Sequence, residues 1–212
     1  MTEINKLIEG YKRFRDNYFV GDKREQLFAE LSQGQNPNTL VIACSDSRVD
    51  PAIIMDSKPG DLFVIRNVAN LVPPYEIGGG YHGVSAALEF AVRYLKVEHV
   101  IVLGHQHCGG IKSLVSGMPE GERSEFIQSW VNIAQNARQS VLKELPHASE
   151  NEQLCACEKA SILVSLENLR TFPWVRQAVS EGKLNLHGWY FDIDKGALSA
   201  HDQNTSSFVS LV

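Results

Sequence analysis

The stretch from Thr39 to Arg48, which reads TLVIACSDSR, decides our expectation for the fold. Its first five residues are apolar or β-branched and predict a buried strand, whereas the four residues after Cys44 are too polar to continue one. A second stretch has the same form, because the apolar residues 100–103 run directly into GHQHCGG at positions 104–110. The carboxyl ends of parallel strands meet at one edge of a sheet. We therefore expect Cys44 and the histidine and cysteine of the second stretch to lie close together.

Outward from these two strands, strand and helix patterns alternate along the chain, which predicts an α/β fold. We expect a mainly parallel central sheet of four strands plus an edge strand, flanked by helices. The predicted strands cover residues 39–44, 62–66, 99–103 and 184–191, with the edge strand after a turn at 194–196. The predicted helices cover residues 51–55, 83–95, 124–145, 150–169 and 173–180.

We predict a single domain over residues 1–212, in which an arm and a core are distinguished. Residues 1–34 should form an N-terminal helical arm with helices over 4–18 and 24–31, and residues 39–212 should form the α/β core. The two terminal helices have no obvious place on the sheet. We therefore expect them to pack on a partner subunit.

Composition and charge exclude several classes of partner and location. A net charge of −5 and a pI near 5.8 argue against binding to nucleic acid or to an anionic membrane. The first residues lack a secretory pattern, and no apolar run is long enough to span a bilayer. The four cysteines are unevenly spaced and do not resemble a disulfide framework. We therefore expect a cytoplasmic protein.

Cys44, His105 and Cys108 form a candidate zinc site at the predicted sheet edge. Two thiols and an imidazole are soft zinc ligands, and three protein ligands are typical of a catalytic zinc with one open position. A closed site would need a fourth ligand. Cys155 and Cys157 are a poor source, because residues two apart on a helix face about 200° apart. Asp46 is the nearby alternative fourth ligand.

Asp46 and Arg48 follow directly after Cys44 and allow two interpretations. Arg48 could hold both oxygens of the Asp46 carboxylate and keep them off the metal, so that Asp46 accepts a hydrogen bond from a zinc-bound hydroxide. Alternatively, the two residues could be a helix cap with an exposed ion pair, which stabilises little. Their position beside Cys44 favours the catalytic interpretation.

Three motifs together resemble the β-class carbonic anhydrases: CSDSR at 44–48, RNVAN at 66–70, and H-x-x-C-G-G at 105–110. The resemblance extends from about residue 33 to residue 189 and is closest to the plant-like branch. It implies one Zn²⁺ per subunit held by Cys44, His105 and Cys108, with Asp46 and Arg48 as a catalytic dyad. It also implies a homodimer or a tetramer, with active sites near the dimer interface.

The resemblance also implies a small pocket for the substrate. It assigns Gln35 and the Gly109 amide as hydrogen-bond donors, and Phe63 and Val68 as apolar wall, while Phe90 stands where plant enzymes have tyrosine. The implied reaction is reversible hydration of carbon dioxide to bicarbonate and a proton by zinc-bound hydroxide. Two alternatives remain open: a zinc hydrolase of a CO₂ analogue such as CS₂ or COS, and a catalytically silent zinc-binding or redox-sensing homologue.

Overall fold

The computed structural model describes residues 2–21, 28–29, 31–78, 80–117 and 124–212, which belong to two compact units, Met1–Asn36 and Pro37–Val212. In the first unit, helix α1 (Glu3–Tyr18) confirms the helix predicted over 4–18. The Thr2 hydroxyl caps it by accepting from the Asn5 N–H at 3.3 Å. The helix predicted over 24–31 lies mostly outside the described residues, and packing of the arm on a partner stays a prediction.

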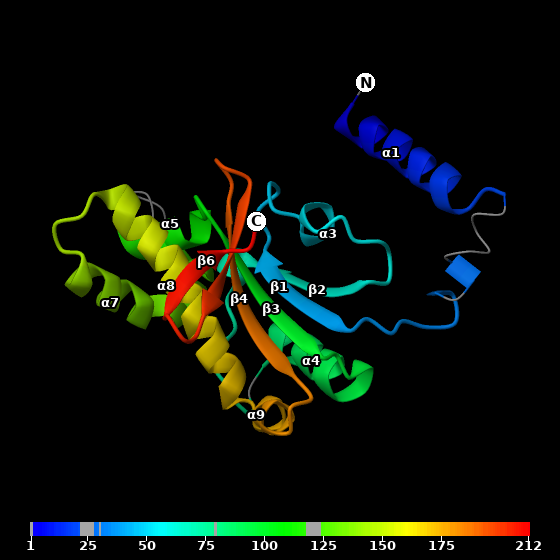
Figure 1. Ribbon diagram of the computed structural model, residues 1–212. Coiled ribbons are helices and arrows are strands. Elements are labelled where there is room, and N and C mark those ends of the chain that lie inside the picture. The colour runs from blue at the N-terminus through cyan, green and yellow to red at the C-terminus, as the bar shows by residue number, and fades with distance from the viewer. Residues whose placement is uncertain (1, 22–27, 30, 79, 118–123) are drawn as a thin grey trace. The chain divides into compact units, whose positions relative to one another are not determined.

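The second unit is built on a six-stranded sheet in the order β2-β1-β3-β4-β5-β6 (Figure 1). The first four strands are parallel, and β5 and β6 are antiparallel to their neighbours. The α/β fold with a mainly parallel sheet is therefore confirmed. The sheet has one strand more than predicted, so that β6 and not β5 is the edge strand next to the antiparallel end. The strands are β1 (Thr39–Cys44), β2 (Leu62–Asn67), β3 (His99–His105), β4 (Asn185–Asp192), β5 (Ala197–Asp202) and β6 (Ser207–Ser210).

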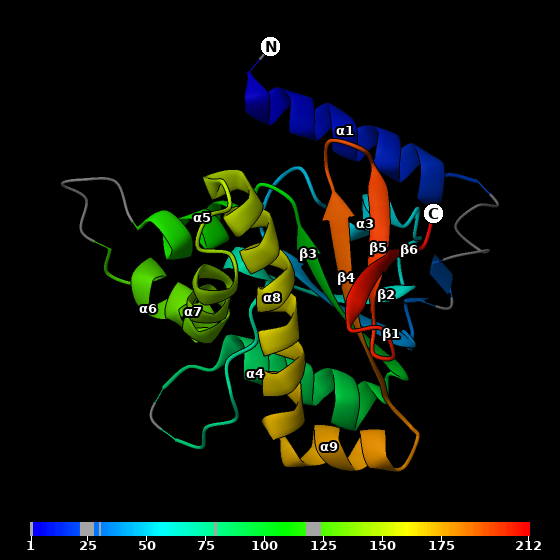
Figure 2. The same cartoon turned by 60° about the vertical axis from the view of Figure 1, so that its left-hand side comes forward.

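Helices flank the sheet, and the longest of them, α8, packs on β3 and β4 (Figure 2). The approach is close: a Cβ on Gly104 would stand 2.7 Å from the Ile162 side chain, so only glycine fits at this point of β3. The helices are α3 (Pro51–Ile54), α4 (Gly83–Glu89), α5 (Gly109–Ser116), α6 (Ile127–Val131), α7 (Gln135–Glu144), α8 (Glu150–Thr171) and α9 (Pro173–Ser180).

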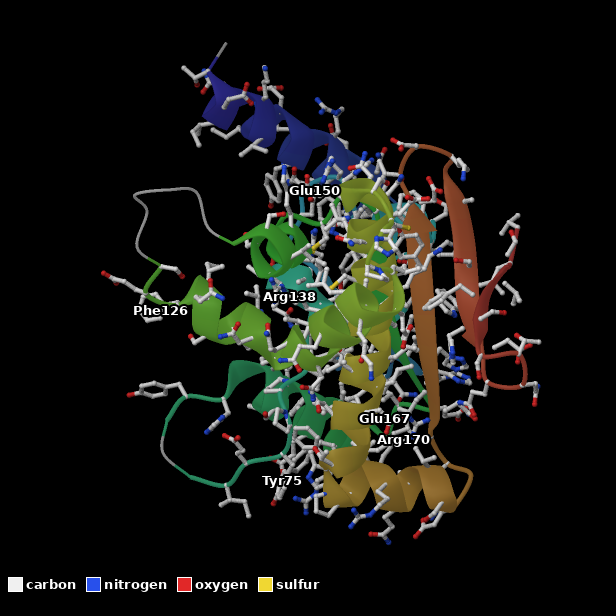
Figure 3. The ribbon with its side chains drawn as sticks, turned by 90° about the vertical axis from the view of Figure 1, so that its left-hand side faces the viewer. Tyr75, Phe126, Arg138, Glu150, Glu167 and Arg170 are labelled. Carbon is white, nitrogen blue, oxygen red and sulfur yellow. The ribbon has the colours of Figure 1, made fainter. Side chains whose placement is uncertain are left out.

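The helix predicted over 124–145 is wrong in its continuity. The segment divides into α6, a 3₁₀ turn over Asn132–Ala134 and α7. A tertiary contact accounts for the break, because the Trp130 indole N–H donates to the Val68 carbonyl at 2.7 Å and ties α6 to the end of β2. Farther along, Arg138 projects from α7 beside α8, and its Nε donates to the Val115 carbonyl near the end of α5 (Figure 3).

The helix predicted over 83–95 changes its winding halfway. It is α-helical to Glu89 and continues as a π-helix over Phe90–Leu95. Two consecutive residues of this segment, Ala91 and Val92, are buried in the core. The segment ends at Lys96, which has a left-handed φ of 59°.

Candidate metal centre

Three segments deliver three donor side chains to one point at the carboxyl edge of the sheet. Cys44 ends β1, His105 ends β3, and Cys108 immediately precedes α5. All three are buried, and their donor atoms lie within 4.8 Å of one another. The two sulfur atoms are 3.9 Å apart. A tetrahedral zinc with Zn–S bonds of 2.3 Å would separate them by about 3.8 Å, so the pair suits such an ion.

The His105 ring offers its free nitrogen to the same point. Its Nδ1 lies 2.8 Å from the Gln106 carbonyl oxygen, which fixes Nδ1 as the protonated nitrogen because a carbonyl can only accept. This leaves a lone pair on Nε2, which is buried and has no hydrogen-bond partner. Buried polar atoms are almost always paired. A metal ion between Nε2 and the two sulfurs would satisfy this atom, and the donor set therefore fits zinc.

The turn after β2 shapes the wall beside Cys44. Asn67, which lies opposite Cys44 in the sheet, holds the turn closed by accepting from the Leu71 N–H and donating to the Leu71 carbonyl, both at 2.9 Å. Inside the turn, Ala69 and Asn70 both have left-handed φ angles, of 65° and 48°. This backbone aims the Ala69 N–H at Cys44 Sγ, at 3.4 Å. The strained turn thus supplies a donor to the sulfur.

The Cys44 and Cys108 side chains interact directly, with their sulfur atoms 3.9 Å apart. The hydrogen bond from Cys108 lowers the pKa of Cys44 to about 4, although burial acts in the opposite direction. The same hydrogen bond, together with burial, raises the pKa of Cys108. Cys108 also occupies the N-cap position of α5, where the helix dipole favours a thiolate. A metal ion would displace the thiol protons and bind both sulfurs as thiolates.

Asp46 and Arg48 form a bidentate ion pair next to the three donors. Arg48 Nε donates to Oδ1 at 2.9 Å, and a terminal nitrogen donates to Oδ2 at 2.7 Å. These hydrogen bonds hold the pKa of Asp46 well below its usual range, so the carboxylate is ionised at neutral pH. Arg66 holds the loop that follows β1, because its guanidinium donates to the carbonyls of Cys44, at 3.0 Å, and Asp46, at 2.6 Å.

Sequence reasoning missed one residue that touches this centre. Glu158 on α8 is 2% exposed, and its Oε1 accepts the backbone N–H of Cys108 at 3.0 Å. The Tyr190 hydroxyl donates to Oε2 at 2.8 Å. Burial raises the pKa of this carboxyl. The signal in the sequence was a lone charged residue within the buried stripe of α8, next to Cys157 and one turn before Ile162.

Two of the residues expected to line the substrate pocket adjoin the donors. Val68 follows the end of β2 and packs against α5, since a Cβ on Gly110 would stand 2.6 Å from Val68 Cγ1. Gly109 follows Cys108, and no atom lies within 4 Å of the position its Cβ would take. The space next to Gly109 is therefore open, whereas the three donors themselves are buried.

Two other expected pocket residues, Phe63 and Phe90, do not lie beside the donors of the same chain. The rings of Phe63 and Phe90 pack together with centroids 5.9 Å apart. Phe63 pairs with Leu40, four residues before Cys44, which places it about 13 Å back along the sheet. Gln35 belongs to the first unit. The structure thus gathers only part of the expected pocket within the second unit.

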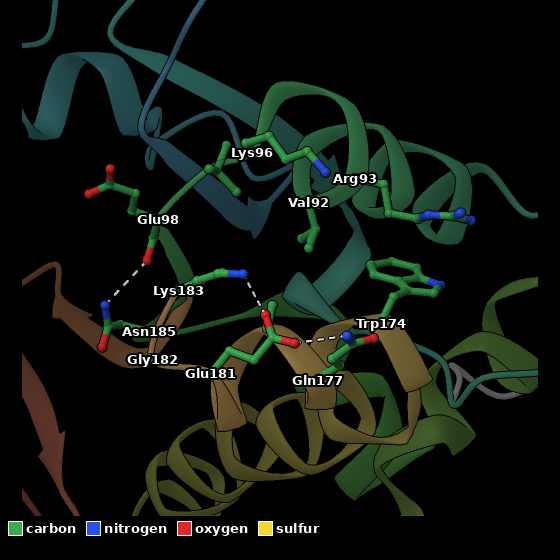
Figure 4. A pocket seen from close by; sticks show the side chains of 12 residues that line it. Val92, Arg93, Lys96, Glu98, Trp174, Gln177, Glu181, Gly182, Lys183 and Asn185 are labelled. Atoms are coloured by element: carbon green, nitrogen blue, oxygen red, sulfur yellow. Dashed lines mark hydrogen bonds and ion pairs between the residues drawn. The ribbon is translucent and has the colours of Figure 1, made fainter.

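No second cluster of metal ligands occurs among the residues that the structure describes. Cys155 and Cys157 do not join the donor group, and no other set of three histidine, cysteine or acidic side chains converges there. A cavity of about 680 Å³ lies at the opposite end of the sheet, since Glu98 precedes β3 and Asn185 begins β4 (Figure 4). Its Glu181 and Lys183 neutralise each other at 2.7 Å. This cavity contains none of the expected site residues.

Comparisons with known proteins place this geometry in a family context. Residues 39–198 match the family model described as carbonic anhydrase. A carbonic anhydrase from Synechocystis sp. (strain ATCC 27184 / PCC 6803 / Kazusa) is 39% identical over 207 residues, which cover 98% of this chain and 74% of the relative. None of the helices that the structure describes is long and apolar enough to cross a membrane.

Solved structures give the same result. The β-carbonic anhydrase CcaA superimposes with a TM-score of 0.91 at 38% identity, covering 99% of this chain and 100% of that one. Tetrameric β-carbonic anhydrases from Sordaria macrospora give a TM-score of 0.75 at 31% identity, over 93% of this chain and 92% of theirs.

Proposed function

This chain belongs to the β-class carbonic anhydrases, and on that premise we propose that it hydrates carbon dioxide reversibly to bicarbonate and a proton at a zinc ion. Cys44, His105 and Cys108 would hold one Zn²⁺ per chain. The observation that carries this assignment is the buried Nε2 of His105, which has no hydrogen-bond partner and stands beside two sulfurs at zinc-ligand spacing. When bound, zinc would supply a Lewis acid that lowers the pKa of water enough to provide a nucleophile near neutral pH.

The protein's own contribution begins with Asp46. Its carboxylate is ionised and can only accept hydrogen bonds. Arg48 occupies both oxygens from one side, which keeps Asp46 in place as an acceptor beside the donor group. We assign to Asp46 the orientation of the attacking water, whose O–H would donate to this carboxylate while a lone pair faces the substrate.

Val68 and Gly109 would hold the substrate next to this water. Val68 provides an apolar contact for a non-polar linear molecule. The backbone N–H of Gly109 would donate to the oxygen on which negative charge develops. Both residues adjoin the donor group, and the space next to Gly109 is open.

Phe63 and Phe90 require a second copy of the chain in this proposal, and we assign Gln35 to the same pocket. Phe63 lies about 13 Å back along the sheet from Cys44, too far to touch a substrate at the same chain's zinc. We therefore propose a homodimer or a tetramer of such dimers, in which these residues complete the pocket of the other copy. The relatives described as tetrameric support an assembly of this kind.

Location in the cytoplasm is part of the same proposal. All four cysteines are free, and a reducing compartment would keep Cys44 and Cys108 available for the metal. Outside a reducing compartment, the sulfurs of Cys44 and Cys108 would be vulnerable to oxidation, because they lie close together.

The test is a stopped-flow measurement of CO₂ hydration on purified protein, with and without a zinc chelator, together with the zinc content. We expect one zinc per chain and an activity that is lost on chelation and restored by zinc. Parallel assays of sulfide release from CS₂ and COS identify the alternative hydrolase. Fully zinc-loaded protein that does not hydrate CO₂ would refute the proposal.

A further inference from the structure

Glu158 is a buried carboxylate to which the proposed mechanism gives no role. It lies on α8, 50 residues beyond Cys108 in the chain, and is 2% exposed. A buried carboxylate is costly unless donors surround it. Glu158 has two: the Cys108 backbone N–H at 3.0 Å and the Tyr190 hydroxyl at 2.8 Å. The fold thus maintains this carboxylate directly behind a metal-ligand residue.

Glu158 binds the N–H of a single peptide group, the one between His107 and Cys108. The N–H of this peptide donates to Glu158 Oε1, and its carbonyl oxygen accepts from Arg48 at 3.1 Å. The peptide group is therefore held by hydrogen bonds at two opposite edges of its plane. One contact comes from the residue that also holds Asp46, and the other comes from the core.

This peptide needs such support because the turn that contains it is strained. His107 has a left-handed φ of 58°, an unfavourable conformation for a residue with a side chain. The turn must nevertheless keep that form, since it brings His105 and Cys108 to one point three residues apart. Cys108 is extended, with φ −70° and ψ 117°, and its N–H lies before the hydrogen-bond ladder of α5. Without Glu158 this buried N–H would have no described acceptor.

We propose that Glu158, oriented by Tyr190, is a positioning residue for the metal centre: it holds the His107–Cys108 peptide so that the Cys108 sulfur faces Cys44 and His105 before the ion binds. The inference rests on the proposed zinc site. The positioning effect depends on the acceptor oxygen of Glu158, because this oxygen accepts the hydrogen bond from the Cys108 N–H. Residues behind a ligand that act in this way typically change metal affinity by 10- to 100-fold when replaced.

The experiment measures zinc affinity by competition with a chelator in the full chain. Glu158→Leu removes the acceptor at similar size, and we expect about a 10- to 100-fold weaker affinity. Glu158→Gln keeps an oxygen for the Cys108 N–H and an amide for the Tyr190 oxygen, so it should retain most of the wild-type affinity. Leu169→Ala, at another buried position of α8, controls for general destabilisation and should leave the affinity unchanged.

A cobalt-substituted sample adds a readout that helix destabilisation alone does not move. The sulfur-to-cobalt absorption bands should shift in Glu158→Leu and remain as in wild type in Glu158→Gln and Leu169→Ala. If Glu158→Leu does not fold, Tyr190→Phe is tested in its place. This substitution leaves Glu158 Oε2 without its donor, and we expect it to weaken the zinc affinity as well. Wild-type affinity and spectrum in the folded variant would overturn the inference. A wild-type protein without zinc would instead refute the metal centre itself.

Discussion

Arg48 donates to both carboxylate oxygens of Asp46, at 2.9 and 2.7 Å, and also to the carbonyl of His107 in the turn that carries two of the three candidate metal donors. One guanidinium thus links the candidate catalytic carboxylate to the backbone of the candidate metal centre. Five donors in a rigid plane make this possible, whereas the single ammonium of lysine cannot reproduce it. The ion pair is therefore better explained as a positioning device than as a surface contact for stability.

Asp46→Asn tests the catalytic half of this arrangement. The substitution preserves shape but removes the ionised acceptor and turns an amide N–H₂ toward the water or toward Arg48. We expect zinc content to remain at the wild-type level and turnover to fall by about 100-fold or more, in the range of general acid–base contributions. Stopped-flow hydration and metal analysis on the same sample measure both. Asp61→Asn, in an exposed turn, is the matched control. Unchanged turnover in Asp46→Asn would exclude the assigned role.

Replacement of the three donor residues tests the proposed metal-binding site. Cys44→Ala, His105→Ala and Cys108→Ala should each lose zinc and activity together, because two remaining donors cannot hold the ion tightly. Cys157→Ala is the control, since it removes an equally buried thiol that lies outside the group. Zinc per chain and CO₂ hydration are measured for all four variants. A folded donor variant that keeps both zinc and activity would show that the ion is held elsewhere.

A pair of histidines at the other end of the sheet predicts how stability changes with pH. His99 Nδ1 lies 3.2 Å from His187 Nε2. Burial, followed by the charge of His99, lowers the pKa of His187 below its usual value of about 6.5. The unfolded chain therefore binds more protons than the folded chain just below that pH. The contribution of neutral His187 to the free energy of unfolding is therefore fully present above about pH 6.5, and it is lost as the pH falls through the folded-state pKa.

Urea denaturation at pH 5 and pH 7 checks this dependence. Wild type should unfold at lower urea at pH 5, and His187→Gln should reduce the difference between the two conditions. His147→Gln, at an exposed position, should leave the difference as in wild type. Equal pH dependence in His187→Gln and wild type would mean that other groups cause it.

The sequence predicted the four parallel strands and the donor group for a simple physical reason. Parallel strands buried on both faces are continuous apolar runs, and such a run must end where polar residues begin, as after Cys44 and His105. The positions of Cys44, His105 and Cys108 follow from that rule together with the spacing within one turn. No knowledge of distant contacts was needed.

The features that sequence reasoning missed depend on contacts between distant segments. Helical periodicity over 124–145 does not reveal that Trp130 bonds the Val68 carbonyl and interrupts the helix. The role of Glu158 becomes visible only when α8 lies behind Cys108. β6 is four residues long and begins and ends with serine, so it is too short for a strand pattern. The resemblance supplied Phe63 as a pocket residue but not its place about 13 Å back along the sheet from Cys44.

That last distance leads to a prediction about which chain completes which pocket. If Phe63 acts on the zinc of a second copy, a dimer of an Asp46→Asn chain and a Phe63→Ala chain contains one site with both defects and one site with none. Either variant alone has a defect in every site. Co-expression with two different affinity tags, followed by purification through both, should therefore recover activity well above that of either homodimer.

The control uses two substitutions that act in the same chain's site. A dimer of an Asp46→Asn chain and a Cys108→Ala chain has a defective residue at each zinc and should remain inactive. Recovery in the first mixture but not in the second identifies Phe63 as a contribution from the other copy. If the first mixture is no more active than its parents, Phe63 acts within its own chain or not at all. The distance of about 13 Å argues against the former, because a phenyl ring cannot extend that far along a sheet.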